Sequence, residues 1–231
     1  MEKNNSENDE IINLVKLGKS KHLKEIQQGK IRFTRMYKYK NMENKNIGDT
    51  YEGLSSIHYT DKDTEYFYSN PLIENGKQIK IKDSILSLAD FPDNNYFVFC
   101  MAYFSITDII NKTIFDSKIY AEEEWNDVLY FYESKNILQK IFDRIEKLNP
   151  KIGPVKYYDY NINQYNLDVL SKSIKYKYQK EYRIAFIPKE NNEFIKIDHD
   201  TLIVDIGNIE SESIIVPKNI FCEGFIIKEN I

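Results

Sequence analysis

The sequence has few of the residues around which metal sites, disulfide frameworks and phosphate loops are usually built. Its 231 residues include two cysteines, three histidines, eight glycines and one tryptophan. The histidines, His22, His58 and His199, are far apart, and none has a cysteine or another histidine at metal-ligand spacing. With so few glycines and no Gly-rich phosphate motif, the sequence does not predict a backbone cradle for phosphate.

Long apolar runs are also missing. No stretch approaches the roughly 20 apolar residues that a membrane-spanning helix needs, and the first ten residues, MEKNNSENDE, do not resemble a signal peptide. Cys100 and Cys222 lie beside strand-like apolar residues, so we expect a cytoplasmic protein with both thiols reduced. The net charge of −4 gives no general attraction to nucleic acid or to an anionic membrane.

Apolar residues are present in ordinary amount, at 42%, and tyrosine is abundant, with 18 copies. Strands rich in tyrosine bury the ring and leave the hydroxyl for hydrogen bonds, which suits a wet pocket or a partner surface. The chain has no Pro- or Gly-rich linker and no internal repeat. We therefore expect a single domain over residues 1–231, with a disordered tail over residues 1–10.

The periodicity of apolar residues predicts helices near the N-terminus and strands near the C-terminus. Helices are expected over residues 11–28, where Ser20 caps the second and Gly29 ends it, and again over residues 136–148. Residues 30–35 alternate as a strand, and residues 96–104 are apolar on both faces, as in a sheet interior. The last 80 residues supply six strand candidates: PVKYYDY, YRIAFIP, EFIKI, TLIVDI, SIIVP and EGFIIK. This pattern predicts an α+β fold with a mostly antiparallel central sheet and two to four flanking helices.

Two polar groups of residues are candidates for function. In the segment YKYQKEYR, Gln179, Glu181 and Arg183 occupy every second position and would share one face of a strand. A buried glutamate needs a donor, so this set is either a structural ion pair or the floor of a polar pocket. The second group is the loop NIGDTYEG, where Asp49 and Glu52 form either a solvated turn or a polar site.

Four segments together resemble an uncharacterised domain family of bacteria and their phages. They comprise an early strand with its acidic GDxxEG-type loop, an apolar strand, a Val-x-Tyr strand and a late strand of the Glu-x-Glu-x-Arg type. In this sequence they read GKIRFTRMYKYKNMENKNIGDTYEG, YFVFCMAYFS, PVKYYD and YKYQKEYRIAF, within residues 20–190. The resemblance implies a bacterial host cell and a phage, mobile-element or defence context, but it carries no activity.

A further resemblance, to the ADP-ribosyltransferase superfamily, concerns mechanism. Its members are α+β proteins that split NAD, and they carry a Gln-x-Glu or Glu-x-Glu pair late in the chain. Gln179 and Glu181 match this pair. The resemblance implies that Glu181 stabilises the oxocarbenium ion and Gln179 positions the acceptor. It further implies cofactor-binding residues for NAD: Arg32, or else Arg35, for the phosphates, and Ser105 and Tyr103 around nicotinamide.

Two hypotheses of different classes follow. The first is an NAD-dependent ADP-ribosyltransferase or NAD hydrolase with Glu181 as its central residue. The alternative is a non-catalytic protein that binds and modulates a bacterial host or defence protein, which the acidic charge and the tyrosines favour. A nuclease ranks third, because Asp49, Glu52 and Glu181 could gather a divalent metal, but no Glu-x-Lys strand signature accompanies them.

Overall fold

The computed structural model describes residues 11–40, 56–59, 66–68, 79–81, 85–88, 95–110, 125–159, 164–188 and 193–222. The expected tail over residues 1–10, the acidic loop with Asp49 and Glu52, and the strand candidate over residues 223–228 lie outside these described residues.

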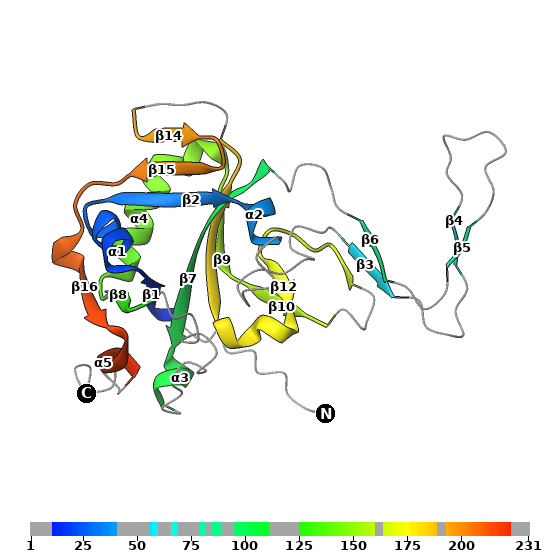
Figure 1. The fold of residues 1–231 in the computed structure, drawn as a ribbon, viewed down its shortest axis with the longest axis horizontal. Coiled ribbons are helices and arrows are strands. Elements are labelled where there is room, and N and C mark those ends of the chain that lie inside the picture. The colour runs from blue at the N-terminus through cyan, green and yellow to red at the C-terminus, as the bar shows by residue number, and fades with distance from the viewer. Residues whose placement is uncertain are drawn as a thin grey trace.

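Within the described residues the structure is a strand-rich α+β fold (Figure 1). Five α-helices are described, of which only α1 and α4 are longer than five residues. Their bounds are α1 Ser20–Gln27, α2 Met36–Lys40, α3 Ile106–Ile110, α4 Ser134–Ile145 and α5 Lys218–Cys222. Three 3-10 helices are η4 Glu146–Leu148, η5 Ile174–Gln179 and η6 Glu210–Glu212.

A nine-stranded sheet forms the centre of the fold, with the order β14-β15-β2-β7-β1-β8-β16, with β13 paired to β7 and with β9 paired to β13. All its pairings are antiparallel, which confirms the predicted fold class. The strands are β1 Ile11–Gly18, β2 Lys30–Arg35, β7 Phe97–Ser105, β8 Asp127–Phe131, β9 Lys151–Pro154, β13 Glu181–Phe186, β14 Ile195–Asp198, β15 Thr201–Asp205 and β16 Ser213–Pro217.

Three smaller sheets accompany the central one. Strands β10 Lys156–Tyr158 and β12 Ser171–Ser173 pair in parallel. Strand β11 Gln164–Tyr165 joins β3 Ser56–Tyr59 and β6 Ile85–Leu88, while β4 Tyr66–Tyr68 pairs with β5 Ile79–Ile81. No helix among the described residues is long and apolar enough to cross a membrane.

Strand β7 is the centre of the sheet, and the sheet forks along one of its edges. Val98 pairs with Ala185 of β13 on one side and with a residue of β2 on the other. Four residues further on, Ala102 pairs with Glu181 of β13 and with Val15 of β1. Strands β2 and β1 therefore share the edge of β7 opposite β13 and diverge from it, so that β2 and β7 cross in Figure 1.

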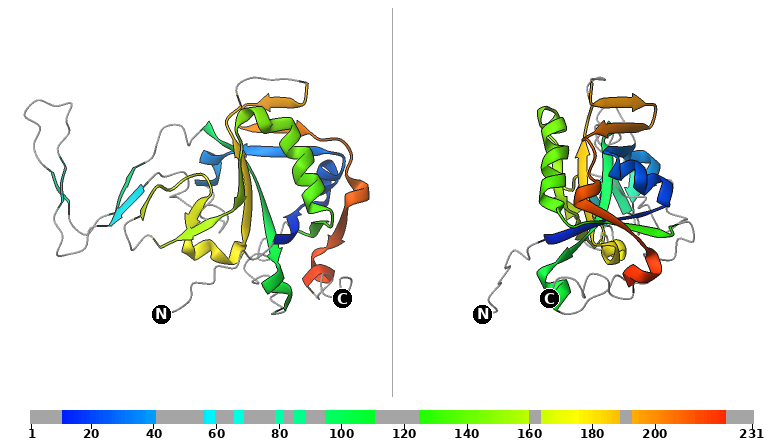
Figure 2. Two further views of the ribbon diagram at one scale, coloured as in Figure 1. Left: turned by 180° about the vertical axis from the view of Figure 1, so that it is seen from behind. Right: turned by 90° about the vertical axis from the view of Figure 1, so that its left-hand side faces the viewer.

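The two faces of β7 belong to different parts of the core. Phe97, Phe99 and Met101 point into the main apolar core, to which α1 and α4 both contribute. In the right-hand view of Figure 2 these helices lie on opposite sides of the strands. On the other face, Val98 and Ala102 belong to two small apolar clusters, one near each end of the strand.

The prediction of two N-terminal helices over residues 11–28 is wrong for its first half. Residues Ile11–Gly18 form β1, between β7 and β8, and only the second half forms a helix, α1. Leu14 packs into the main core while Val15 packs on the opposite face, so the apolar run reflects burial of a strand on both faces.

The predicted cap of α1 is also wrong, whereas its end is as expected. Lys19 is the N-cap residue, and the Ser20 hydroxyl donates instead to the carboxylate of Asp127. Gly29 follows the helix with φ of +89°, in the left-handed region, and a Cβ there would lie 2.1 Å from the Gly207 carbonyl oxygen. Glycine is therefore required at this close approach.

Candidate functional site

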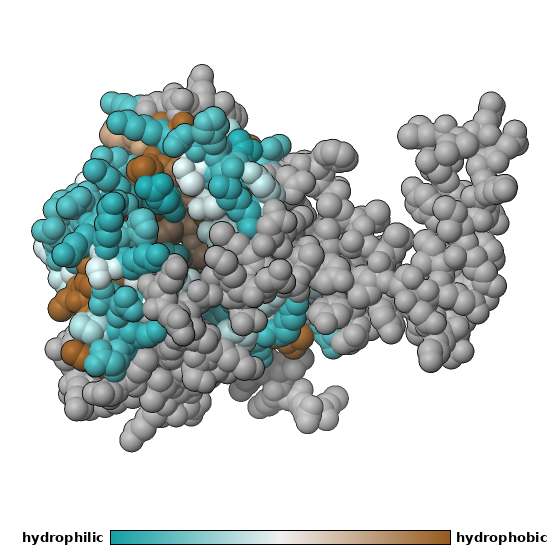
Figure 3. All heavy atoms as spheres, in the orientation of Figure 1, coloured by the Kyte–Doolittle hydropathy of each residue, from teal (hydrophilic) through white to brown (hydrophobic). Residues whose placement is uncertain are grey.

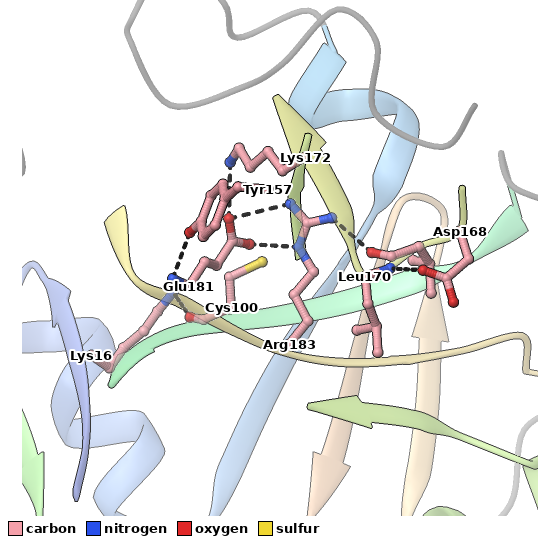
Figure 4. Close-up of polar contacts among 9 residues, drawn as sticks. Lys16, Cys100, Tyr157, Asp168, Leu170, Lys172, Glu181 and Arg183 are labelled. Carbon is pink, nitrogen blue, oxygen red and sulfur yellow. Dashed lines mark hydrogen bonds and ion pairs between the residues drawn. The ribbon is translucent and has the colours of Figure 1, made fainter. Parts of the chain in front are cut away.

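The candidate site is a cluster of charged side chains on the face of β7 and β13 that points away from the main apolar core (Figure 4). The carboxylate of Glu181 accepts a hydrogen bond from Arg183 Nε at 2.6 Å and another from Arg183 Nη2 at 3.2 Å. Lys172 Nζ lies 2.9 Å from Glu181 Oε2. Arg183 Nη1 in turn donates to the Val169 carbonyl oxygen at 2.8 Å. Both oxygens of the carboxylate are thus held by cations.

The strands place these three side chains together. Glu181 and Arg183 are two residues apart on β13 and face the same way, opposite Ala102 and Cys100 of β7. Lys172 comes from β12, which reaches the site because it pairs in parallel with β10. The β10 residue Tyr157 accepts a hydrogen bond from the backbone N–H of Glu181 at 2.8 Å through its hydroxyl oxygen. Glu181 therefore links the small parallel sheet to the central one.

The cluster is almost completely buried. Glu181 is 6% exposed, Arg183 1% and Lys172 2%. Burial alone would raise the pKa of Glu181, but the Arg183 guanidinium and the Lys172 ammonium outweigh it and hold that pKa well below its usual range. The carboxylate is therefore ionised at neutral pH. Without its cations a buried carboxylate would cost several kcal/mol, roughly 3–5.

The same buried environment raises the pKa of two neighbouring groups, Cys100 and Tyr157. Burial raises the pKa of the Cys100 thiol to about 12, and the negative charge of Glu181 adds to this effect. The thiol is therefore protonated at neutral pH, and it is a poor nucleophile. Burial likewise raises the pKa of the Tyr157 hydroxyl. Neither group is prepared for attack on a substrate.

Lys16 occupies the fork where β1 and β2 diverge from β7. Its Nζ donates to the Cys100 carbonyl oxygen at 2.6 Å and lies 5.2 Å from the centre of the Phe99 ring. Burial lowers the pKa of Lys16, while the charge of Glu181 opposes that shift. The amine therefore supplies a donor to a carbonyl at the point where β7 has no described strand beside it on this edge.

Gln179 does not share a strand with Glu181, so the predicted alternation of three polar residues is wrong at its first member. Gln179 is the last residue of η5 and is half-buried. The break occurs because Lys180 takes a left-handed conformation with φ of 44°, and β13 begins only at Glu181. The Glu181–Arg183 pair itself is present, in the structural form that the sequence left open.

Ser105 has a local structural role. Its hydroxyl oxygen accepts a hydrogen bond from the Asp108 N–H at 3.3 Å, and its own N–H donates to Asp108 Oδ2 at 2.9 Å. This reciprocal pattern is the capping box that begins a helix, here α3. Lys180 forms an ion pair with the same Asp108. Tyr103 is half-buried and packs against the main apolar core, so it lies on the opposite face of β7 from Glu181.

The two arginines considered for phosphate binding lie in other ion pairs. Arg32 is exposed on β2, and its Nη2 lies 3.6 Å from Glu25 Oε2 of α1. Arg35 donates from Nε to the His199 carbonyl oxygen at 3.1 Å and lies 3.7 Å from Asp200 Oδ1. The structure therefore brings together Glu181 and Arg183, while Gln179 lies outside β13, Arg32 pairs with Glu25, Ser105 caps α3 and Tyr103 packs on the opposite face of β7.

Sequence reasoning missed Lys172, Lys16 and Tyr157. The need of a buried Glu181 carboxylate for hydrogen-bond donors was a usable signal, but the sequence did not identify the strand that supplies them.

Among the described residues no group of three or more His, Cys, Asp or Glu side chains could hold a metal ion. Comparison of the chain with family models, with curated proteins and with solved structures found no match.

Proposed function

We propose that this protein acts by binding another protein, and that the charge cluster around Glu181 supports the binding scaffold. The observation that carries the proposal is the engagement of both Glu181 oxygens by Arg183 and Lys172 in a buried site. A carboxylate that stabilises an oxocarbenium ion must contact the ribose. Here both of its oxygens contact Arg183 or Lys172 instead.

The composition and the surface support a binding role. The chain has 18 tyrosines, a residue type enriched at protein interfaces, and a net charge of −4. In Figure 3 the coloured surface is mainly hydrophilic, with separate small apolar patches. Exposed apolar side chains include Ile214 of β16 and Ile220 of α5, at 42% and 45% exposure. The resemblance to the phage and bacterial family makes a host or defence protein of the bacterial cytoplasm the proposed partner.

The test combines an activity assay with a binding assay. Purified protein is incubated with NAD, released nicotinamide is measured by chromatography, and candidate host proteins are tested for a stoichiometric complex by size exclusion. We expect no nicotinamide above a heat-denatured control and a stable complex with one partner. Turnover of NAD that disappears in Gln179→Ala, a variant outside the buried cluster, would overturn the proposal.

An NAD-dependent ADP-ribosyltransferase is the second candidate, and one observation favours it. Gln179 and Glu181 are two residues apart in the sequence, which is the spacing of the Gln-x-Glu pair in that superfamily. Glu181 would stabilise the cation and Gln179 would position the acceptor. Arg183 and Lys172 would first have to release the carboxylate. The nicotinamide assay above decides between the two candidates.

A further inference from the structure

The strand order of the central sheet ends at β14 on one side and at β16 on the other, and the two edge strands differ in character. On β14 the exposed side chains are Lys196 and Asp198. Charged side chains on an edge strand hinder pairing with another chain. Strand β16 reads Ser-Ile-Ile-Val-Pro and carries no charged side chain, and its Ile214 is 42% exposed. In Figure 3 apolar side chains gather at the lower left, over β16 and α5.

Alternate backbone groups of β16 point away from β8, toward the outer edge of the sheet. The Lys218 N–H donates to the Asn126 carbonyl oxygen at 2.9 Å, which continues the antiparallel register of β16 with β8. In such a ladder residues two apart face the same way, so Ile214 and Val216 also face β8. No described strand pairs with the outer edge. The residues whose backbone groups face it are Ser213, Ile215 and Pro217.

The outer edge of β16 is complementary to itself. In an antiparallel pair of two copies centred on Ile215, the two Ile215 residues exchange both of their backbone hydrogen bonds. The Ser213 N–H of each copy then faces the Pro217 carbonyl of the other. Pro217 has no N–H to return, but the Ser213 carbonyl oxygen already accepts a hydrogen bond from Gln27 Nε2 at 3.3 Å. The proline therefore leaves no carbonyl of the pair without a donor.

The side chains along the strand fit the same pairing. Ile214 of each copy lies opposite Val216 of the other, so the exposed isoleucine gains an apolar neighbour. Glu212 precedes the strand and Lys218 follows it, each three residues from Ile215. Glu212 of each copy therefore lies opposite Lys218 of the other, at both ends of the pair. This charge complementarity favours a second copy of the chain over an unrelated strand as the occupant of the edge.

We propose that β16 pairs with β16 of a second copy, so that two central sheets join into one continuous sheet across a twofold axis. The pairing goes beyond the binding function proposed above, because it concerns two copies of this chain. It stands or fails whatever host protein the chain binds.

The first experiment measures the mass of the full chain by sedimentation equilibrium over a dilution series. We expect a dimer with twice the chain mass of 27.5 kDa. Ile214→Lys places a charge opposite Val216 at both ends of the pair and should raise the dissociation constant by about a hundredfold or more. Ile174→Lys makes the same change at an isoleucine of η5 that is 48% exposed, and this control should dimerise as the wild type does.

Amide hydrogen exchange followed by NMR tests the pairing residue by residue. Exchange of the Ile215 amide should slow by about tenfold or more as the concentration rises, whereas the Ile214 and Val216 amides, which face β8, should keep their rates. In Ile214→Lys the Ile215 amide should exchange fast at every concentration. Lys218→Glu, a second variant that leaves β16 itself unchanged, places two carboxylates opposite each other and should weaken the dimer by about tenfold.

Four results would overturn the pairing. The first two are a wild type that stays monomeric and a dimer that Ile214→Lys leaves intact. The third is an Ile215 amide that is protected at every concentration, because the chain itself would then cover the edge. The fourth is protection of Ile215 only when a host protein is added, which would assign the edge to that protein.

Discussion

The two faces of β7 are buried by different kinds of side chain. One face carries Phe97, Phe99 and Met101 into a continuous apolar core. The other face places Val98 and Ala102 on either side of Cys100, which pairs with Arg183. Residues only one position apart on β7 therefore lie in a mainly apolar environment on one face and beside buried charges on the other.

The two faces of β7 should differ in how well they tolerate amino-acid substitutions. Apolar packing is non-directional, so a core position accepts another side chain of similar volume at modest cost. The charged face depends on three groups at once, because each buried charge is stable only while the others satisfy it. We therefore expect the charged face to be the more sensitive to single changes, although it contains less apolar surface.

The largest expected effect comes from removing the carboxylate. Glu181→Ala leaves Arg183 and Lys172 buried without their counter-ion and should lower the free energy of unfolding by about 3–5 kcal/mol, measured by urea denaturation. Replacing the whole set with Glu181→Leu, Arg183→Met and Lys172→Met should restore most of that loss, since a well-packed apolar substitute is often neutral. A single-variant loss below about 1 kcal/mol would show that the charges are solvated in solution.

The charged face should also make the stability of the protein depend on pH. The pKa of Glu181 is lowered in the folded state, so its contribution to stability is complete above its ordinary value of 4.5 and is lost as the pH falls below it. We expect urea denaturation of the wild type to show a steeper loss of stability between about pH 5 and pH 3 than Glu181→Gln does. If the curves of unfolding free energy against pH are parallel for the two proteins, groups other than Glu181 cause the loss of stability in acid.

How far the sequence predicts the fold depends on how local each signal is. An apolar stripe predicts the helix over residues 136–148: Ile137, Leu138, Ile141, Phe142, Ile145 and Leu148. In α4 the three isoleucines are buried as expected, whereas Phe142 is 38% exposed. The apolar run of β7 predicts a sheet interior for the same reason, since both faces are buried. The run at residues 11–18 does not distinguish a helix from a strand, because in β1 both Leu14 and Val15 are buried.

The candidate site was only half predictable. Glu181 and Arg183 are neighbours on one strand, so their pairing follows from the alternation of side chains. The exclusion of Gln179 depends on a left-handed lysine at position 180, and a lysine gives no sequence signal for that conformation. Lys172 reaches the site through the parallel pairing of β10 with β12, which is a property of the tertiary structure.

A substitution of Lys16 tests whether its amine stabilises β7 at the point where β1 and β2 diverge from it. Lys16→Met keeps an unbranched side chain of similar length but removes the ammonium that donates to the Cys100 carbonyl and lies over the Phe99 ring, so we expect a loss of about 1–3 kcal/mol in urea denaturation. Lys24→Met, at an exposed position of α1, is the control and should change stability by less than about 0.5 kcal/mol. Equal effects of the two changes would mean that water satisfies the carbonyl.

The smallest expected effect is at the end of β7, where Ser105 begins α3. Ser105→Ala removes the acceptor of the Asp108 N–H and should cost about 1 kcal/mol in thermal or urea unfolding, whereas Ser105→Thr should retain most of it. That result would mean that the Ser105 hydroxyl acts as the cap of α3, and that no bound ligand is needed to account for it. A loss above about 3 kcal/mol would instead mean that Asp108, through its ion pair with Lys180, transmits the change to the charged face. The polar residues of β7 and β13 would then act as one network.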